Sequence, residues 1–318
     1  MKISNLIMLW FLIISILMSF STSSFFFLWM CMEINMMSFI PLLNFKNLMN
    51  TNSMMMYFII QAFSSSMLIF SIIFLNMNMN EDKTNLISFL SLLMKMGASP
   101  FHMWFPLMVE GLNYFSFFLV STFQKLIPLY MISFFFSWII FLSIILSALI
   151  GSIGGFNQFS IRKLMAFSSI SHIAWMLTLI SINSNLWILY FLIYTMISGL
   201  IMFMFNKMNM HFFFQTNFFS KENLIFFIIL LLSLGGIPPM IGFFMKWIVL
   251  KNLILFTKFL FIPLIFSSLL NLFFYMRLLY PFFLKNFSIL KWKTYYNFYM
   301  IMFFSSQFFL TFCLISFL

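Results

Sequence analysis

Four charged residues lie inside long apolar stretches of this 318-residue chain: one acid, Glu33, and three lysines, Lys95, Lys125 and Lys246. A charged side chain at the centre of a bilayer costs about 3 kcal/mol on insertion scales, so each should face a protein interior or a wet cavity. A lysine buried beside a carboxylate exchanges its proton as one member of a coupled pair. One acid supplies too few oxygen ligands for a sodium ion, so this set of residue types favours proton transfer.

Each of these charges also has a structural interpretation, and the sequence leaves it open. A lysine near the end of a span can extend its ammonium group to the lipid headgroups, an interpretation that applies best to Lys246. His172, which follows three serines between 168 and 171, is either a proton relay that titrates near neutrality or a hydrogen-bonded packing residue.

The composition of the chain is that of a membrane protein. Of all residues 64% are hydrophobic and 7% are charged, and the mean hydropathy is +1.10, whereas soluble domains are about one quarter charged. Apolar runs of about 20 residues match a hydrocarbon core about 30 Å thick. We therefore expect an all-α polytopic membrane protein, a single membrane domain over residues 1–318, with about eleven transmembrane helices. Their ranges are 3–22, 24–43, 54–77, 85–105, 112–136, 138–156, 160–182, 186–206, 223–250, 259–284 and 297–317.

Glycine and proline interrupt the fourth and ninth expected helices, and each interrupted helix carries one lysine. Proline removes an amide donor and clashes with the preceding turn. Such breaks at matching places in two halves indicate an ion path. The pattern predicts two inverted five-helix repeats, residues 1–136 and 138–284, with discontinuous fourth and ninth helices, plus a final helix at 297–317. The expected helix breaks are Gly97, Pro100, Pro128, Gly235, Gly236, Pro238 and Pro239.

Basic residues are distributed unevenly between the two sets of connecting segments. The N-terminal side collects nine, Lys2, Lys46, Arg162, Lys163, Lys207, Lys221, Lys285, Lys291 and Lys293, and the other side three, Lys83, Lys251 and Lys258. By the positive-inside rule the N-terminus lies inside, and after an odd number of crossings the C-terminus lies outside.

Nothing in the sequence predicts a cofactor site. The two cysteines, Cys31 and Cys313, both fall in apolar spans, and there is no CxxC pair, no histidine pair at helical spacing and no glycine fingerprint. We expect this chain to hold no metal, haem, iron–sulfur cluster, flavin or nicotinamide.

Several motifs carry a family resemblance, spread from residue 29 to about residue 280. "MEINMMSFIPLL", "KMGASPFHMWFP", "STFQKLIP", "GGFNQFSIRKLMAFSSISHIAWM" and "GGIPPMIGFFMKW" closely resemble the antiporter-like membrane subunits of respiratory complex I, which are similar to cation/proton antiporter subunits. The residues that match the family's proton-path glutamate and lysines are Glu33, Lys95, Lys125 and Lys246. The sequence departs from the family at Leu107, where an acid is expected, and carries Glu110 instead.

The resemblance implies a non-redox, proton-translocating subunit of mitochondrial NADH:ubiquinone oxidoreductase in the inner membrane, with the N-terminus on the matrix side and the C-terminus towards the intermembrane space. NADH, FMN, iron–sulfur clusters and ubiquinone would lie in or between other subunits. The implied partners are other membrane-arm subunits, including neighbouring antiporter-like chains, and phospholipid, but no nucleic acid. A free-standing antiporter and a purely structural scaffold remain the alternatives.

Overall fold

The computed structural model describes residues 3–43, 48–77, 81–135, 137–182, 184–212 and 221–286, and almost all of them are helical. Within these ranges the only β pairing is an isolated bridge between Ser160 and Phe212. The chain divides into two compact units at Ser147/Ala148, inside helix α8 (Ile139–Phe156). An all-helical fold suits a lipid bilayer, because a helix satisfies the hydrogen bonds of its own backbone where no water is present.

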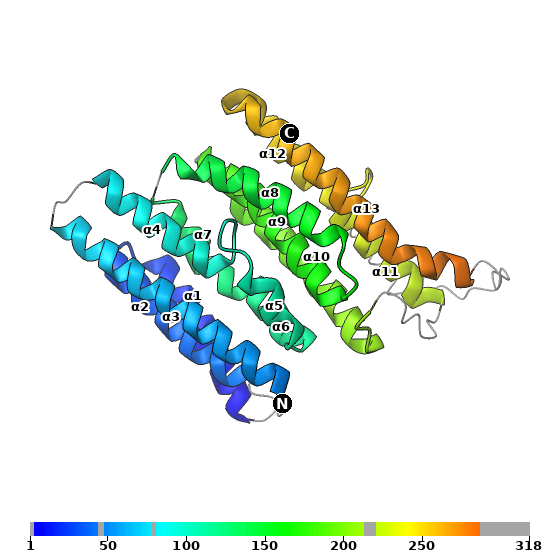
Figure 1. Ribbon diagram of the computed structural model, residues 1–318, viewed down its shortest axis with the longest axis horizontal. Helices are drawn as coiled ribbons and strands as arrows, with labels where there is room; N and C mark the ends of the chain where they lie inside the picture. The colour runs from blue at the N-terminus through cyan, green and yellow to red at the C-terminus, as the bar shows by residue number, and fades with distance from the viewer. Residues whose placement is uncertain are drawn as a thin grey trace. The chain divides into compact units, whose positions relative to one another are not determined.

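The first unit packs helices around α3 (Leu48–Asn76), which contacts α2 (Phe25–Phe39) and α4 (Glu81–Met96) (Figure 1). Helix α7 (Phe123–Ile132) lies against both α2 and α4. The remaining elements of this unit are α1 (Ile3–Ser21), the short 3₁₀ helix η1 (Ile40–Leu43), α5 (Trp104–Glu110) and α6 (Tyr114–Ser121).

The second unit is built around α9 (Ile161–Ser181), whose most apolar 18-residue stretch is 94% buried. Helices α10 (Leu186–Met208), α12 (Ile241–Phe256) and α13 (Phe261–Asn286) all contact it. Helix α11 (Lys221–Gly235) packs against α10 and α13, and the 3₁₀ helix η2 (Lys258–Leu260) joins α12 to α13.

Seven segments of the described chain are long and apolar enough to cross a membrane. Helix also occupies most of each of the first ten ranges expected from the sequence. The expected eleventh helix, at 297–317, lies outside the described residues. The described residues therefore show a helical fold with seven candidate membrane spans, and the finer arrangement of eleven spans stays a prediction.

Two glycines end helices in the same way, one in each unit. Gly97 and Gly236 have φ angles of +69° and +83°, a region that favours glycine. Behind Gly97, the amide of Ala98 donates to Leu93 O at 3.1 Å and that of Gly97 to Met94 O at 3.2 Å. Around Gly236, Ile237 N donates to Leu232 O at 3.3 Å and Gly236 N to Ser233 O at 3.1 Å. Both patterns are the Schellman motif.

The fold corrects one expected break. Pro128 was expected to interrupt the fifth helix, but it lies inside α7, and the interruption is at Thr122, between α6 and α7. A proline inside a helix can be accommodated by local distortion. Thr122 ends α6 instead: its φ of −122° and ψ of −82° lie outside the helical region, and its hydroxyl donates to Phe118 O at 2.6 Å.

The close approach of α11 and α12 gives a stability test. A Cβ on Gly242 would overlap the backbone carbonyl of Ser233, whereas a Cβ on Gly235 would meet only ordinary contacts, the nearest at 3.5 Å from the Tyr275 ring. We expect Gly242→Ala to lower the free energy of unfolding by about 3 kcal/mol and Gly235→Ala to leave it unchanged or raise it by about 1 kcal/mol. Thermal unfolding in detergent measures both, and equal effects would contradict the packing.

Candidate functional site

The ion pair between Glu33 on α2 and Lys95 on α4 is the centre of the first unit's site. Lys95 Nζ lies 3.8 Å from Glu33 Oε1, and the side chains are 3% and 22% exposed. This separation exceeds the roughly 2.8 Å of a direct charge-assisted hydrogen bond. Glu33 Oε1 has no hydrogen-bond donor among the described residues. The two charges therefore attract each other without sharing a proton directly.

The helix break beside Lys95 gives that lysine its electrostatic setting. Lys95 lies in the last turn of α4, where the partial negative charge of the helix C-terminus favours a cation. Ending the helix at Gly97 also frees backbone carbonyls of the last turn. The carbonyl of Lys95 is met by the side chain of Gln61 on α3, whose Nε2 donates to it at 3.0 Å.

Lys125 is the second buried lysine of this unit and follows the interruption at Thr122. It is 2% exposed, and its Nζ lies 4.8 Å from the centroid of the Phe105 ring. A ring face attracts a desolvated cation through its quadrupole. The Phe105 ring is therefore one of the contacts that stabilise the buried ammonium group.

Lys246 is the buried lysine at the second break and lies on α12, the helix that follows the break. It is 6% exposed, and its Nζ donates to the backbone carbonyl of Gly235 at 2.7 Å, the last residue of α11. The ammonium group thus lies at the negative end of α11 and satisfies a carbonyl that the break leaves free. Gly236 makes room for it, because a Cβ there would lie 3.0 Å from Nζ.

His172 is the predicted site residue with the largest set of polar neighbours. It is 1% exposed on α9, its Nδ1 lies 2.8 Å from the hydroxyl of Tyr190, and its ring centroid lies 4.9 Å from that of Tyr194. One residue before it, Ser171 accepts a hydrogen bond of 2.7 Å from Asn271 Nδ2 on α13. These contacts suit both interpretations of His172, relay and packing.

Uncharged polar residues, which the pattern of charges did not predict, surround these sites. They are Asn35, Tyr57, Gln61, Gln124, Tyr190, Tyr194 and Asn271. The signal was present, because an amide side chain within an apolar span also needs partners when it is buried. The pattern of charged residues alone does not reveal these amides.

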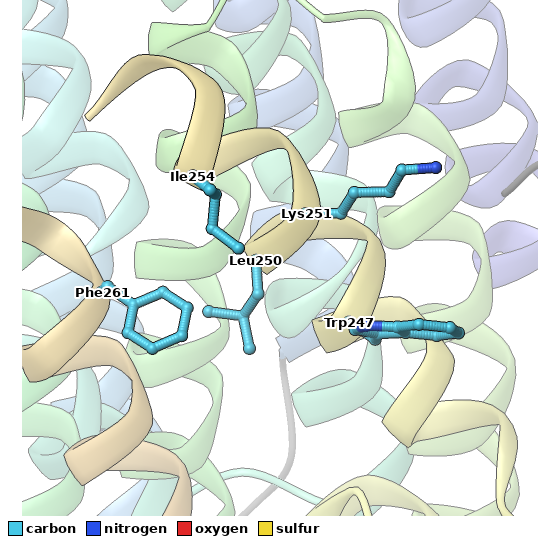
Figure 2. A pocket seen from close by; sticks show the side chains of 5 residues that line it. All are labelled: Trp247, Leu250, Lys251, Ile254 and Phe261. Carbon is cyan, nitrogen blue, oxygen red and sulfur yellow. The ribbon is translucent and has the colours of Figure 1, made fainter. Parts of the chain in front are cut away.

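The site is a set of buried charges and not a ligand pocket. A groove of about 450 Å³ does occur in the second unit, lined by Trp247, Leu250, Lys251, Ile254 and Phe261 (Figure 2). Leu250 and Phe261 face each other across it, and none of the predicted proton-path residues lines it. Among the described residues, no three His, Cys, Asp or Glu side chains gather closely enough to hold a metal ion.

Comparison with known proteins gives a consistent result. Residues 22–271 match the family model described as NADH:quinone oxidoreductase/Mrp antiporter, TM. The chain is 43% identical over 310 residues to NADH-ubiquinone oxidoreductase chain 2 of Anopheles gambiae, covering 93% of this chain and 91% of that protein.

Two solved structures share the fold. A chain of respiratory complex I from Thermus thermophilus aligns with a TM-score of 0.79 at 16% identity, covering 88% of this chain and 70% of that one. A chain of the Mrp complex from Dietzia aligns with a TM-score of 0.78 at 14% identity, covering 85% and 59%. Because the family model spans most of the sequence, this chain belongs to the NADH:quinone oxidoreductase/Mrp antiporter family of membrane proteins.

Proposed function

We propose that this chain is a proton-translocating, antiporter-like subunit of mitochondrial NADH:ubiquinone oxidoreductase. In this proposal the partly buried Glu33 and the buried Lys95, Lys125, Lys246 and His172 carry the protons. The observation that supports this most directly is the ion pair of 3.8 Å between Glu33 and Lys95 beside the break at Gly97. Buried ionisable groups in a membrane are retained for function or for helix pairing, and the family membership favours function.

The proposed mechanism begins with the Glu33–Lys95 pair. Because the two groups titrate as a unit, a change in charge near Glu33 changes how firmly Lys95 holds its proton. Lys95 would then exchange a proton with Lys125 through water within the first unit. In the second unit, Lys246 at the end of α11 would pass charge to a neighbouring subunit or to the outer side, with His172 as an intermediate carrier.

The electron carriers of the reaction would belong to other chains. In this proposal NADH, FMN, the iron–sulfur clusters and ubiquinone are bound in or between other subunits, and this chain contributes no redox centre. Its partners would be other membrane-arm subunits, neighbouring antiporter-like chains and phospholipid, with no nucleic acid. The conformational change that accompanies electron transfer elsewhere would reach Glu33 through those subunit contacts.

The finer architecture is part of the same proposal. We infer one membrane domain of two inverted five-helix repeats, 1–136 and 138–284, with discontinuous fourth and ninth helices and a final helix at 297–317. The matched Schellman motifs at Gly97 and Gly236, each followed three residues later by a proline, support it. The uneven distribution of basic residues supports an N-terminus in the matrix and a C-terminus in the intermembrane space.

Replacing Lys95 tests the proposal directly. Lys95→Met keeps the bulk of the side chain and removes its charge, and Lys83→Met makes the same change at an exposed position of α4. We expect Lys95→Met to lower proton pumping per NADH oxidised by this chain's share, far less than the roughly hundredfold effect of a lost acid–base group, because other subunits would still pump. Lys83→Met should pump normally.

The measurement is acidification of proteoliposomes that contain the purified, assembled complex, with complex abundance measured in parallel. Normal abundance with unchanged pumping in Lys95→Met would make the lysine structural and favour a scaffold role.

The second break predicts a matched pair on α12. Lys246→Met leaves the Gly235 carbonyl without its ammonium donor, so we expect a loss of about 2 kcal/mol of stability as well as weaker pumping. Lys251→Met removes an exposed charge five residues later and should change neither. Thermal inactivation and pumping of the assembled complex measure both, and a loss of stability with intact pumping would exclude Lys246 from the path.

A further inference from the structure

A chain of neutral hydrogen bonds links three helices of the first unit, and we call its members Tyr57, Gln124 and Asn35 the amide bridge. The hydroxyl of Tyr57 on α3 donates to Gln124 Oε1 at 3.0 Å. Gln124 Nε2 on α7 then donates to Asn35 Oδ1 on α2 at 2.9 Å. Both ends of the Gln124 side chain are engaged, so its amide group has one orientation.

The amide bridge lies where burial makes its hydrogen bonds consequential. Tyr57 is fully buried and Asn35 is 3% exposed. Removing one partner of a buried hydrogen bond leaves the other with an unmet requirement, and inside a membrane no bulk water can meet it. The three side chains therefore fix the relative positions of α2, α3 and α7 more firmly than apolar packing alone.

Each helix joined by the amide bridge also positions one of the buried charges. Asn35 lies two residues after Glu33 on α2, and Gln124 immediately precedes Lys125 on α7. On α3, Gln61 lies one turn after Tyr57, on the same face, and holds the backbone carbonyl of Lys95. Within the amide bridge, Gln124 is therefore the residue next to Lys125 in the chain, and Asn35 is two residues from Glu33.

We propose that Gln124 is a positioning residue that holds Lys125 in register with the Glu33–Lys95 pair, so that the charge state of the pair determines proton uptake at Lys125. Gln124 itself carries no proton. Its role rests on the proposed function of the buried lysines and adds to it the element that couples them. Tyr57 acts through Gln124, because its hydroxyl fixes which way the amide group points.

The test compares four variants, and Gln124→Glu as a rescue variant, in the assembled complex, reconstituted in proteoliposomes with NADH and a soluble ubiquinone. Gln124→Leu removes both ends of the amide, and Tyr57→Phe removes only the hydroxyl. The double variant combines them, and Tyr130→Phe removes a phenol hydroxyl on the same helix as Gln124 but outside the amide bridge. Pumping per NADH oxidised is measured across pH, together with complex abundance.

We expect Gln124→Leu to lower pumping by about fivefold, the factor that corresponds to one lost hydrogen bond, and to displace its pH profile. Tyr57→Phe should show a smaller effect in the same direction, and the double variant should be no worse than Gln124→Leu, since the two residues act through one contact. Gln124→Glu, which keeps the acceptor for Tyr57, should restore part of the loss. Tyr130→Phe should match the unmodified complex.

Two results would overturn the inference. One is Gln124→Leu with reduced abundance but unchanged pumping and pH profile per assembled complex, which would make the amide bridge structural. The other is strictly additive effects of Tyr57→Phe and Gln124→Leu. Lys95→Met separates this inference from the proposed function: if it pumps normally the proton path itself fails, whereas weak pumping in Lys95→Met with normal pumping in Gln124→Leu removes only the role of Gln124.

Discussion

The structure depends on one constraint: inside a membrane, every backbone carbonyl freed by a broken helix must find its donor within the protein. The two breaks meet it in different ways. At Gly97 the amide of Gln61 satisfies the carbonyl of Lys95, and at Gly236 the ammonium group of Lys246 satisfies the carbonyl of Gly235. In both cases a lysine comes to lie at the negative end of a helix, so the break that frees a carbonyl also stabilises a buried charge.

The sequence predicted the buried charges well because the cost of charge in lipid is large and independent of detail. It also predicted the breaks at Gly97 and Gly236, since glycine followed by proline is a strong stop signal. Pro128 was misplaced because proline alone does not decide where a helix ends. The helix ends where the backbone of Thr122 leaves the helical region and its hydroxyl bonds to Phe118 O, and such a local bond has no clear pattern in a sequence rich in serine.

The sequence could not predict which polar residues pair with one another, for a different reason. Gln124 and Tyr57 are 67 positions apart, and Asn271 and Ser171 are 100 apart. Only the tertiary fold brings these groups together, in the second case through the packing of α13 on α9. The positions of charged residues in the sequence identify a candidate site, but the orientation of its side chains depends on the tertiary structure. Proton transfer depends on orientation, so in the proposed mechanism the neutral residues would contribute alongside the lysines.

The bond from Lys246 to a backbone carbonyl has a consequence for how relatives of this chain can diverge. Glu33 and Lys95 are held by each other, so a substitution in one can be compensated by a substitution in the other, and the two positions should covary. Every residue type carries a carbonyl, so no change of side chain at position 235 removes the acceptor of Lys246. A substitution at position 246 should therefore need no compensating substitution at position 235. Whether position 246 keeps a lysine should depend on whether its charge is needed.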